Sequence, residues 1–141
     1  SKEEWANIKR DDLIQSSSEL FGSDFTNAVK VAPSNDMILV GTFAMKVAKR
    51  LLHIDIDIEF VKGGFNMVTA QFGNNTLTFN VSKLKGFFDN PITANQIDLI
   101  LHEIGHYNGM HTEDSYHRLI TKMAGELVII ALKEPEFFKA K

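Results

Sequence analysis

The chain has 141 residues with 44% hydrophobic and 23% charged side chains, a globular composition that excludes general disorder. Fifteen Lys and Arg against eighteen Asp and Glu give a net charge of -3, so we expect neither a nucleic-acid partner nor a membrane partner. Cysteine is absent, which excludes disulfides, thiolate metal ligands and a cysteine nucleophile.

The first residues read Ser-Lys-Glu-Glu without a methionine, so we expect the chain to be a piece of a longer protein with a companion domain. The lack of cysteine fits a cytoplasmic location, and no apolar run approaches the roughly 20 residues that span a bilayer. We divide the chain into a partly helical N-terminal extension, residues 1–35, and a single domain, residues 36–141.

Two helices are predicted in the first third of the chain. One lies around residues 12–21, before a connection that ends at Pro33-Ser34-Asn35. From about residue 36 to 52, apolar residues recur mostly at spacings of three and four, as one face of a helix requires. Basic residues gather near the end of this second segment, where a helix C-terminus favours cations.

Strands are predicted next, because the period of the pattern changes to two. Apolar and acidic residues alternate over 54–60, and β-rich runs over 66–72 and 76–81 flank the turn Gly73-Asn74-Asn75. A turn of this composition indicates a hairpin. We therefore expect three consecutive strands in a mostly antiparallel meander.

Two helices are predicted to close the domain. Thr93 and Gln96 have the spacing of a capping box, and the helix that they open can end at Asn108-Gly109. A last helix is expected from near Thr112 to about residue 133, stopped by Pro135. The predicted order of N-terminal helices, three strands and two helices indicates an α+β fold.

Histidine is concentrated in one short stretch, because four of the five histidines lie within residues 102–117. Residues 102–106 read His-Glu-Ile-Gly-His, the H-E-x-x-H pattern. Two histidines four apart on a helix share one face, so His102 and His106 can bind one Zn²⁺. Glu103 lies about 100° around the helix, where it can take a proton from a zinc-bound water. A chance match to the pattern is the alternative, and the independently predicted helix favours a metal site.

This region resembles the active-site helix of the zincin metallopeptidases, on the residues His102-Glu103-Ile104-Gly105-His106 followed by Gly109 and His111. The resemblance covers roughly residues 54–128 and implies a compact zincin-like fold, a Zn²⁺ cofactor and a peptide or protein substrate. The metzincin continuation does not fit, because its next histidine would be at Thr112. The region also resembles C-terminal segments of bacterial proteins whose N-terminal half is an Hsp90-type ATPase.

The third zinc ligand has four candidates: His111, Glu113, His117 and Glu126. His111 is preferred, because Gly109 can turn the chain back toward the metal. His117 would lie at the same height as His106. Its side chain would point sideways, away from the apolar face of the last predicted helix. Glu126 has the thermolysin-like spacing from His106 but would lie roughly 20 Å away along the helix. His117 and Glu126 stay open as alternatives.

Asp98 and Tyr116 are candidates for supporting roles around the metal. Asp98 precedes His102 by one turn and can accept a hydrogen bond from its imidazole, and Tyr116 can donate to an oxyanion. Solvent exposure is an equal alternative for Asp98, and packing is the favoured role for Tyr116. We predict a zinc-dependent peptide hydrolase with Glu103 as general base. The alternative is a zinc-stabilised binding or regulatory domain without catalysis; hydrolysis of a non-peptide amide is a weaker third possibility.

Overall fold

The computed structural model describes residues 28–63, 68–108 and 114–139, and the fold is α+β, as predicted. Its main elements are β1 (Ala28–Lys30), α2 (Asn35–Leu52), β2 (Asp57–Gly63), β3 (Ala70–Gly73), β4 (Thr76–Asn80), α3 (Ala94–Ile104) and α4 (Asp114–Lys133). Short 3₁₀ helices follow three of them: η2 (Val81–Lys83), η3 (Gly105–Asn108) and η4 (Pro135–Phe138). The helix expected over 12–21 lies outside the described residues.

The helix predicted over 36–52 is confirmed as α2. Its N-terminus is capped by Ser34, whose hydroxyl accepts from the Met37 N–H at 3.3 Å. His53 ends it in the left-handed conformation with φ 58°. The face that α2 turns to the sheet is apolar, and Gly41 permits close packing there, because a Cβ on it would lie 3.2 Å from Ile58 Cγ2.

The four strands form one mixed sheet in the order β1-β2-β4-β3. β1 pairs with β2 and β3 pairs with β4, both antiparallel, but β2 pairs with β4 in parallel. The predicted three-stranded meander is therefore wrong, although most of the pairings are antiparallel. Alternation assigns side chains to the two faces of a sheet, but it does not identify the neighbouring strand.

The predicted hairpin is confirmed, with Asn74 and Asn75 at φ 52° and 54° in the turn between β3 and β4. The first predicted strand, expected over 54–60, begins later, and β2 starts at Asp57. The preceding Ile56 is nevertheless buried in the core. β1 was not predicted; its residue Val29 pairs with Lys62 of β2, so residues 28–30 belong to the sheet.

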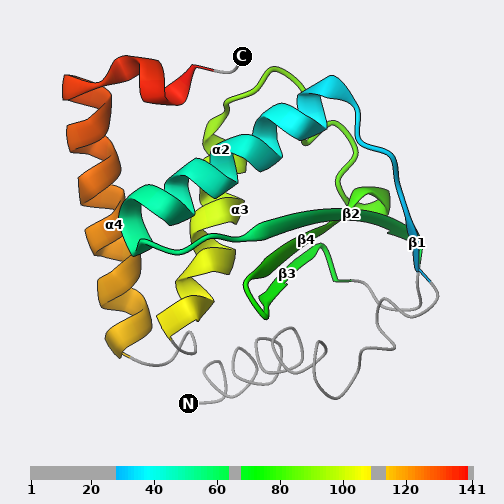
Figure 1. The fold of residues 1–141 in the computed structure, drawn as a ribbon, viewed down its shortest axis with the longest axis horizontal. Coiled ribbons are helices and arrows are strands. Elements are labelled where there is room, and N and C mark those ends of the chain that lie inside the picture. The colour runs from blue at the N-terminus through cyan, green and yellow to red at the C-terminus, as the bar shows by residue number, and fades with distance from the viewer. Residues whose placement is uncertain (1–27, 64–67, 109–113, 140–141) are drawn as a thin grey trace.

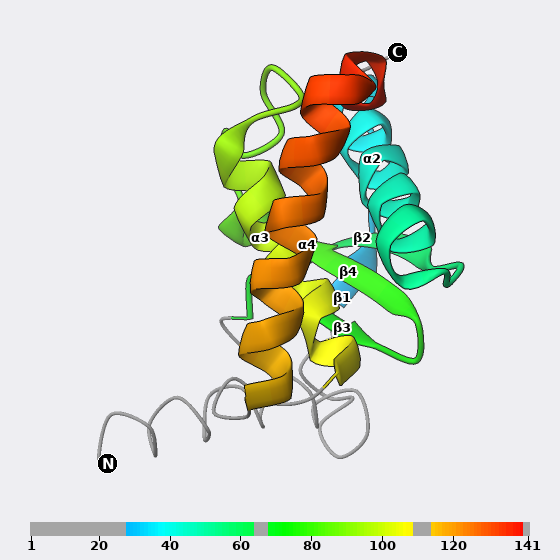
Figure 2. The same ribbon diagram turned by 90° about the vertical axis from the view of Figure 1, so that its left-hand side faces the viewer.

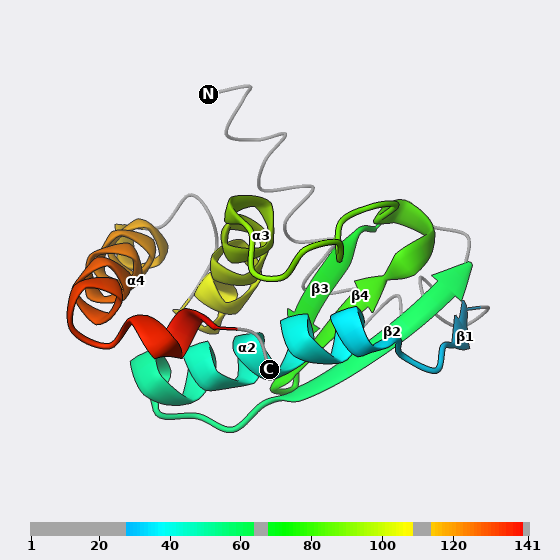
Figure 3. The same ribbon diagram turned by 90° about the horizontal axis from the view of Figure 1, so that it is seen from above.

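The described helices pack around one apolar core. α2 lies over one face of the sheet, and α3 lies between α4 and β3 (Figure 1, Figure 3). Figure 2 faces α4, with α3 on one side of it and α2 on the other. The centre of the core holds Val40, Leu77, Phe79, Ile100, Ile104 and Met123, all fully buried. None of the described helices is long and apolar enough to cross a membrane.

Candidate metal centre

The helix that carries the H-E-x-x-H residues begins where the capping box predicted. Thr93 Oγ1 accepts from the Gln96 N–H at 3.2 Å, and the Thr93 N–H donates to Gln96 Oε1 at 2.9 Å. Gln96 is fully buried, and its Nε2 also donates to the carbonyls of Phe87 and Asp89 at 2.8 and 3.3 Å. This polar anchor holds the start of α3 against the loop that precedes it.

His102, Glu103 and His106 lie together at the end of α3 and in the following η3. The imidazole centroids of His102 and His106 are 5.6 Å apart with their planes at 89°. The α-helix tightens into the 3₁₀ turn η3 at Gly105, so the predicted helix to Asn108 is α-helical only as far as Ile104. The two imidazoles remain neighbours through this change of helix type.

Glu103 is buried, with 3% of its surface exposed, and its carboxyl lies near the His102 imidazole. Its Oε2 lies 3.8 Å from His102 Nε2, and its Oε1 has no hydrogen-bond partner in the described part of the chain. Burial raises the pKa of the Glu103 carboxyl to about 8. A carboxyl in this position is poised to hold or release a proton near neutral pH, and a neighbouring cation would favour its charged form.

Of the four candidates for the third ligand, only His117 and Glu126 lie among the described residues. His111 and Glu113 lie outside the described residues. His117 is exposed on α4, with its ring 5.6 Å from the ring of Tyr116 and perpendicular to it. Within the described ranges, no three His, Asp or Glu side chains are grouped so that they could hold a metal ion.

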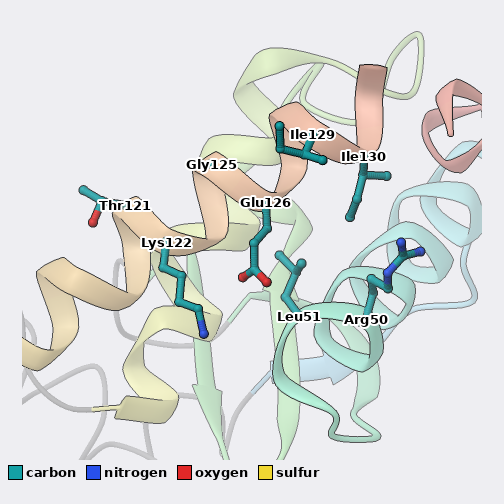
Figure 4. A pocket seen from close by; sticks show the side chains of 8 residues that line it. All are labelled: Arg50, Leu51, Thr121, Lys122, Gly125, Glu126, Ile129 and Ile130. Atoms are coloured by element: carbon teal, nitrogen blue, oxygen red, sulfur yellow. The ribbon is translucent and has the colours of Figure 1, made fainter. Parts of the chain in front are cut away.

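Glu126 lies in a different part of the fold from the histidines. It lines a cavity of about 650 Å³ between α2 and α4, where its carboxylate points toward Leu51 (Figure 4). Neither His102 nor His106 lines this cavity. Ten residues separate Glu126 from Tyr116, which is about 15 Å along the axis of α4. Tyr116 contacts both imidazoles, so α4 meets the H-E-x-x-H residues near its N-terminus.

Of the two candidates for supporting roles, Tyr116 is in the site. Tyr116 is 4% exposed, and its hydroxyl donates to the His102 carbonyl oxygen at 3.0 Å. Asp98 is exposed on α3. Burial raises the pKa of Tyr116, and the charges of Glu103 and Asp98 add to this effect. This burial agrees with packing, the role favoured for Tyr116, and the hydroxyl faces a backbone carbonyl.

Gly105, inside the motif, was not among the predicted site residues, although α4 packs directly against it. A Cβ at this position would lie 2.5 Å from Ile120 Cδ1 and 2.9 Å from Tyr116 Cε1. The available signal was a glycine within a predicted helix, which costs about 1 kcal/mol relative to alanine and so indicates a packing reason. Here the reason is the close approach of α4.

Comparison with known protein families, curated proteins and solved structures finds no significant match to this chain.

Proposed function

We propose that this chain is a zinc-dependent peptide hydrolase in which His102 and His106 bind the metal and Glu103 is the general base. The observation that supports this most is the pairing of two adjacent imidazoles with a buried carboxylate whose Oε1 lacks a hydrogen-bond partner among the described residues. A buried carboxylate without partners is costly unless a cation or a water completes its interactions. The donor set therefore fits a zinc ion with a coordinated water.

When bound, zinc lowers the pKa of a coordinated water to about 7 and polarises a carbonyl oxygen. Glu103 accepts the proton of the attacking water and passes it to the leaving amine. Its Oε1 suits this role, because this atom is not already engaged by another described residue. The surrounding burial keeps competing water away from the carboxyl.

A peptide substrate fits the edge strand β3. β3 is the last strand of the sheet, and it contacts α3 and η3, which carry the site. The Asn80 N–H donates to the Thr69 carbonyl at 2.8 Å, so by antiparallel alternation the backbone groups of Ala70 and Phe72 point away from β4. No described strand pairs with this edge, which can add an extended peptide by backbone hydrogen bonds.

Zinc content and hydrolysis, measured together, test the proposal. We expect the full chain to bind one zinc per chain and to cleave a mixture of unstructured synthetic peptides, with the products identified by mass spectrometry. The variant Glu103→Gln should keep the zinc. Its rate of hydrolysis should fall by about 10²–10⁴-fold, the contribution that general-base catalysis typically makes.

Glu136→Gln is the matched control, because Glu136 is exposed on η4 and should leave both properties unchanged. A parent chain without zinc would refute the metal centre. Zinc binding without cleavage of any peptide in the mixture would instead favour the non-catalytic zinc-stabilised domain.

A further inference from the structure

Tyr116 connects α4 to the end of α3 through its hydroxyl. His102 is in the last turn of α3, where the α-helix passes into η3. The Tyr116 hydroxyl donates to the His102 carbonyl oxygen at 3.0 Å, although the two residues belong to different helices. The bond therefore fixes the backbone of His102, from which the first imidazole projects.

The ring of Tyr116 contacts the second imidazole. The centroids of the Tyr116 and His106 rings are 5.1 Å apart, with their planes at 34°. The same tyrosine ring meets the His102 imidazole at 6.4 Å, edge to face. His106 is 6% exposed, so contact with a buried aromatic ring limits the orientations that its imidazole can adopt.

Gly105 makes this arrangement possible. Any side chain at that position would collide with Tyr116 and Ile120, because a Cβ would lie within 3 Å of both. The glycine between Glu103 and His106 therefore serves the approach of α4 to the site. Without a side chain at Gly105, the tyrosine ring can lie directly over the last turn of the motif.

From these contacts we infer that Tyr116 is a positioning residue, which fixes the His102 backbone through its hydroxyl and the His106 imidazole through its ring. This inference rests on the proposed function only where it concerns metal affinity. The alternative role, hydrogen bonding to a reaction intermediate, requires a hydroxyl that faces the substrate. The Tyr116 hydroxyl faces the protein backbone instead and is buried.

Three variants of the full chain separate the contributions of ring and hydroxyl. Tyr116→Leu removes both, and Tyr116→Phe removes only the hydroxyl. Tyr107→Leu is the matched control, because Tyr107 is the only other tyrosine and is 50% exposed. The first readout, made without metal, is the NMR shift of the His106 ring protons, which a neighbouring aromatic ring displaces.

We expect Tyr116→Leu to move the His106 ring signals, while Tyr116→Phe and the Tyr107 control leave them near their original positions. The second readout is the affinity for Co²⁺, followed by its visible absorption spectrum. Loss of a residue that orients a metal ligand typically weakens affinity by about 10–100-fold. We expect a loss of about tenfold for Tyr116→Phe, a larger loss for Tyr116→Leu and none for Tyr107→Leu.

Unchanged His106 signals in Tyr116→Leu would overturn the positioning role. Unchanged Co²⁺ affinity in both Tyr116 variants would also overturn it. If the parent binds no Co²⁺, the proposed function fails, but the NMR comparison still decides whether Tyr116 orders the imidazole. If Tyr116→Leu does not fold, the Co²⁺ spectrum of Tyr116→Phe is compared with that of the parent chain. The spectrum must change if the hydroxyl fixes His102, and an unchanged spectrum would contradict the positioning role.

Discussion

Two imidazoles fill only part of the coordination shell that zinc takes in proteins, so one more protein ligand is expected in a catalytic site. His117 is exposed beside Tyr116, and Glu126 points into the cavity between α2 and α4. Among the described residues, neither side chain forms a metal-binding group of three with His102 and His106. The preference for His111 therefore continues to rest on its place just after Gly109 in the sequence.

Metal analysis of single variants tests this preference. We expect His111→Ala to weaken zinc affinity strongly. The loss should exceed the effect of removing a residue that only orients a ligand, which is about 10–100-fold. His117→Ala and Glu126→Ala should bind zinc as the parent does. The opposite result, with zinc lost only in His117→Ala, would move the third ligand to α4. A strong loss in both histidine variants would indicate a closed four-ligand shell and favour the non-catalytic domain.

For single residues, the sequence predicted which side chains of the motif are neighbours better than it predicted what packs around them. The spacing of His102 and His106 was sufficient to predict that they are neighbours, since that depends only on local helix geometry. The burial of Glu103 and the contacts of Tyr116 were not predictable in this way. They depend on which side of the helix the rest of the fold covers, and the spacing of the histidines does not determine that.

At the scale of helices, Gly105 and Gly125 form a natural comparison. A Cβ on Gly105 would meet Ile120 at 2.5 Å, whereas one on Gly125 of α4 would meet nothing within 4 Å. We expect Gly105→Ala to lower the free energy of unfolding by about 1–3 kcal/mol, because the packed helices must separate. Gly125→Ala should raise it by about 0.5–1 kcal/mol through helix propensity alone.

Urea denaturation of the two variants measures both effects. Equal stabilities of Gly105→Ala and Gly125→Ala would show that α4 does not pack as closely on η3 as the described contacts require.

The helices were easier to predict than the sheet. The signals for α2 and α3 are local, because the capping residues and the apolar periodicity lie in or next to each helix. Both helices were confirmed. The β3–β4 hairpin was confirmed for the same reason, because its turn residues lie between the two strands. The pairing of β2 with β4 joins strands that are not consecutive, and no local pattern distinguishes that neighbour from β3.

At the scale of the whole molecule, the C-terminal segment closes the fold against α2. The rings of Phe137 and Phe138 pack on Phe43, with centroids 6.0 and 5.7 Å away. Lys46 Nζ donates to the Phe137 carbonyl at 2.7 Å and lies 4.8 Å from the Phe137 ring centroid. Arg50 also pairs with Glu134. The last residues of the described chain thus fasten α2 to the end of α4.

We expect Lys46→Met to lower the free energy of unfolding by about 1–3 kcal/mol, because it removes a charge-assisted hydrogen bond and a cation–π contact. Lys49→Met on the same helix is the control. Its ion pair with Asp55 is largely exposed, so its loss should change stability by less than about 0.5 kcal/mol. Thermal and urea unfolding of both variants measure the difference. Equal effects would show that the C-terminal segment does not stabilise α2.

The buried Gln96 has a consequence for the direction in which the distant Glu103 points. Its side chain is held inward by the carbonyls of Phe87 and Asp89, which prevents α3 from turning about its own axis. Glu103 follows seven residues later, close to two full turns, so it must face the same interior side. The direction of the Glu103 side chain is thus fixed at the opposite end of its helix. Insertion of one residue after Gln96 would rotate Glu103 about the helix axis by about 100°.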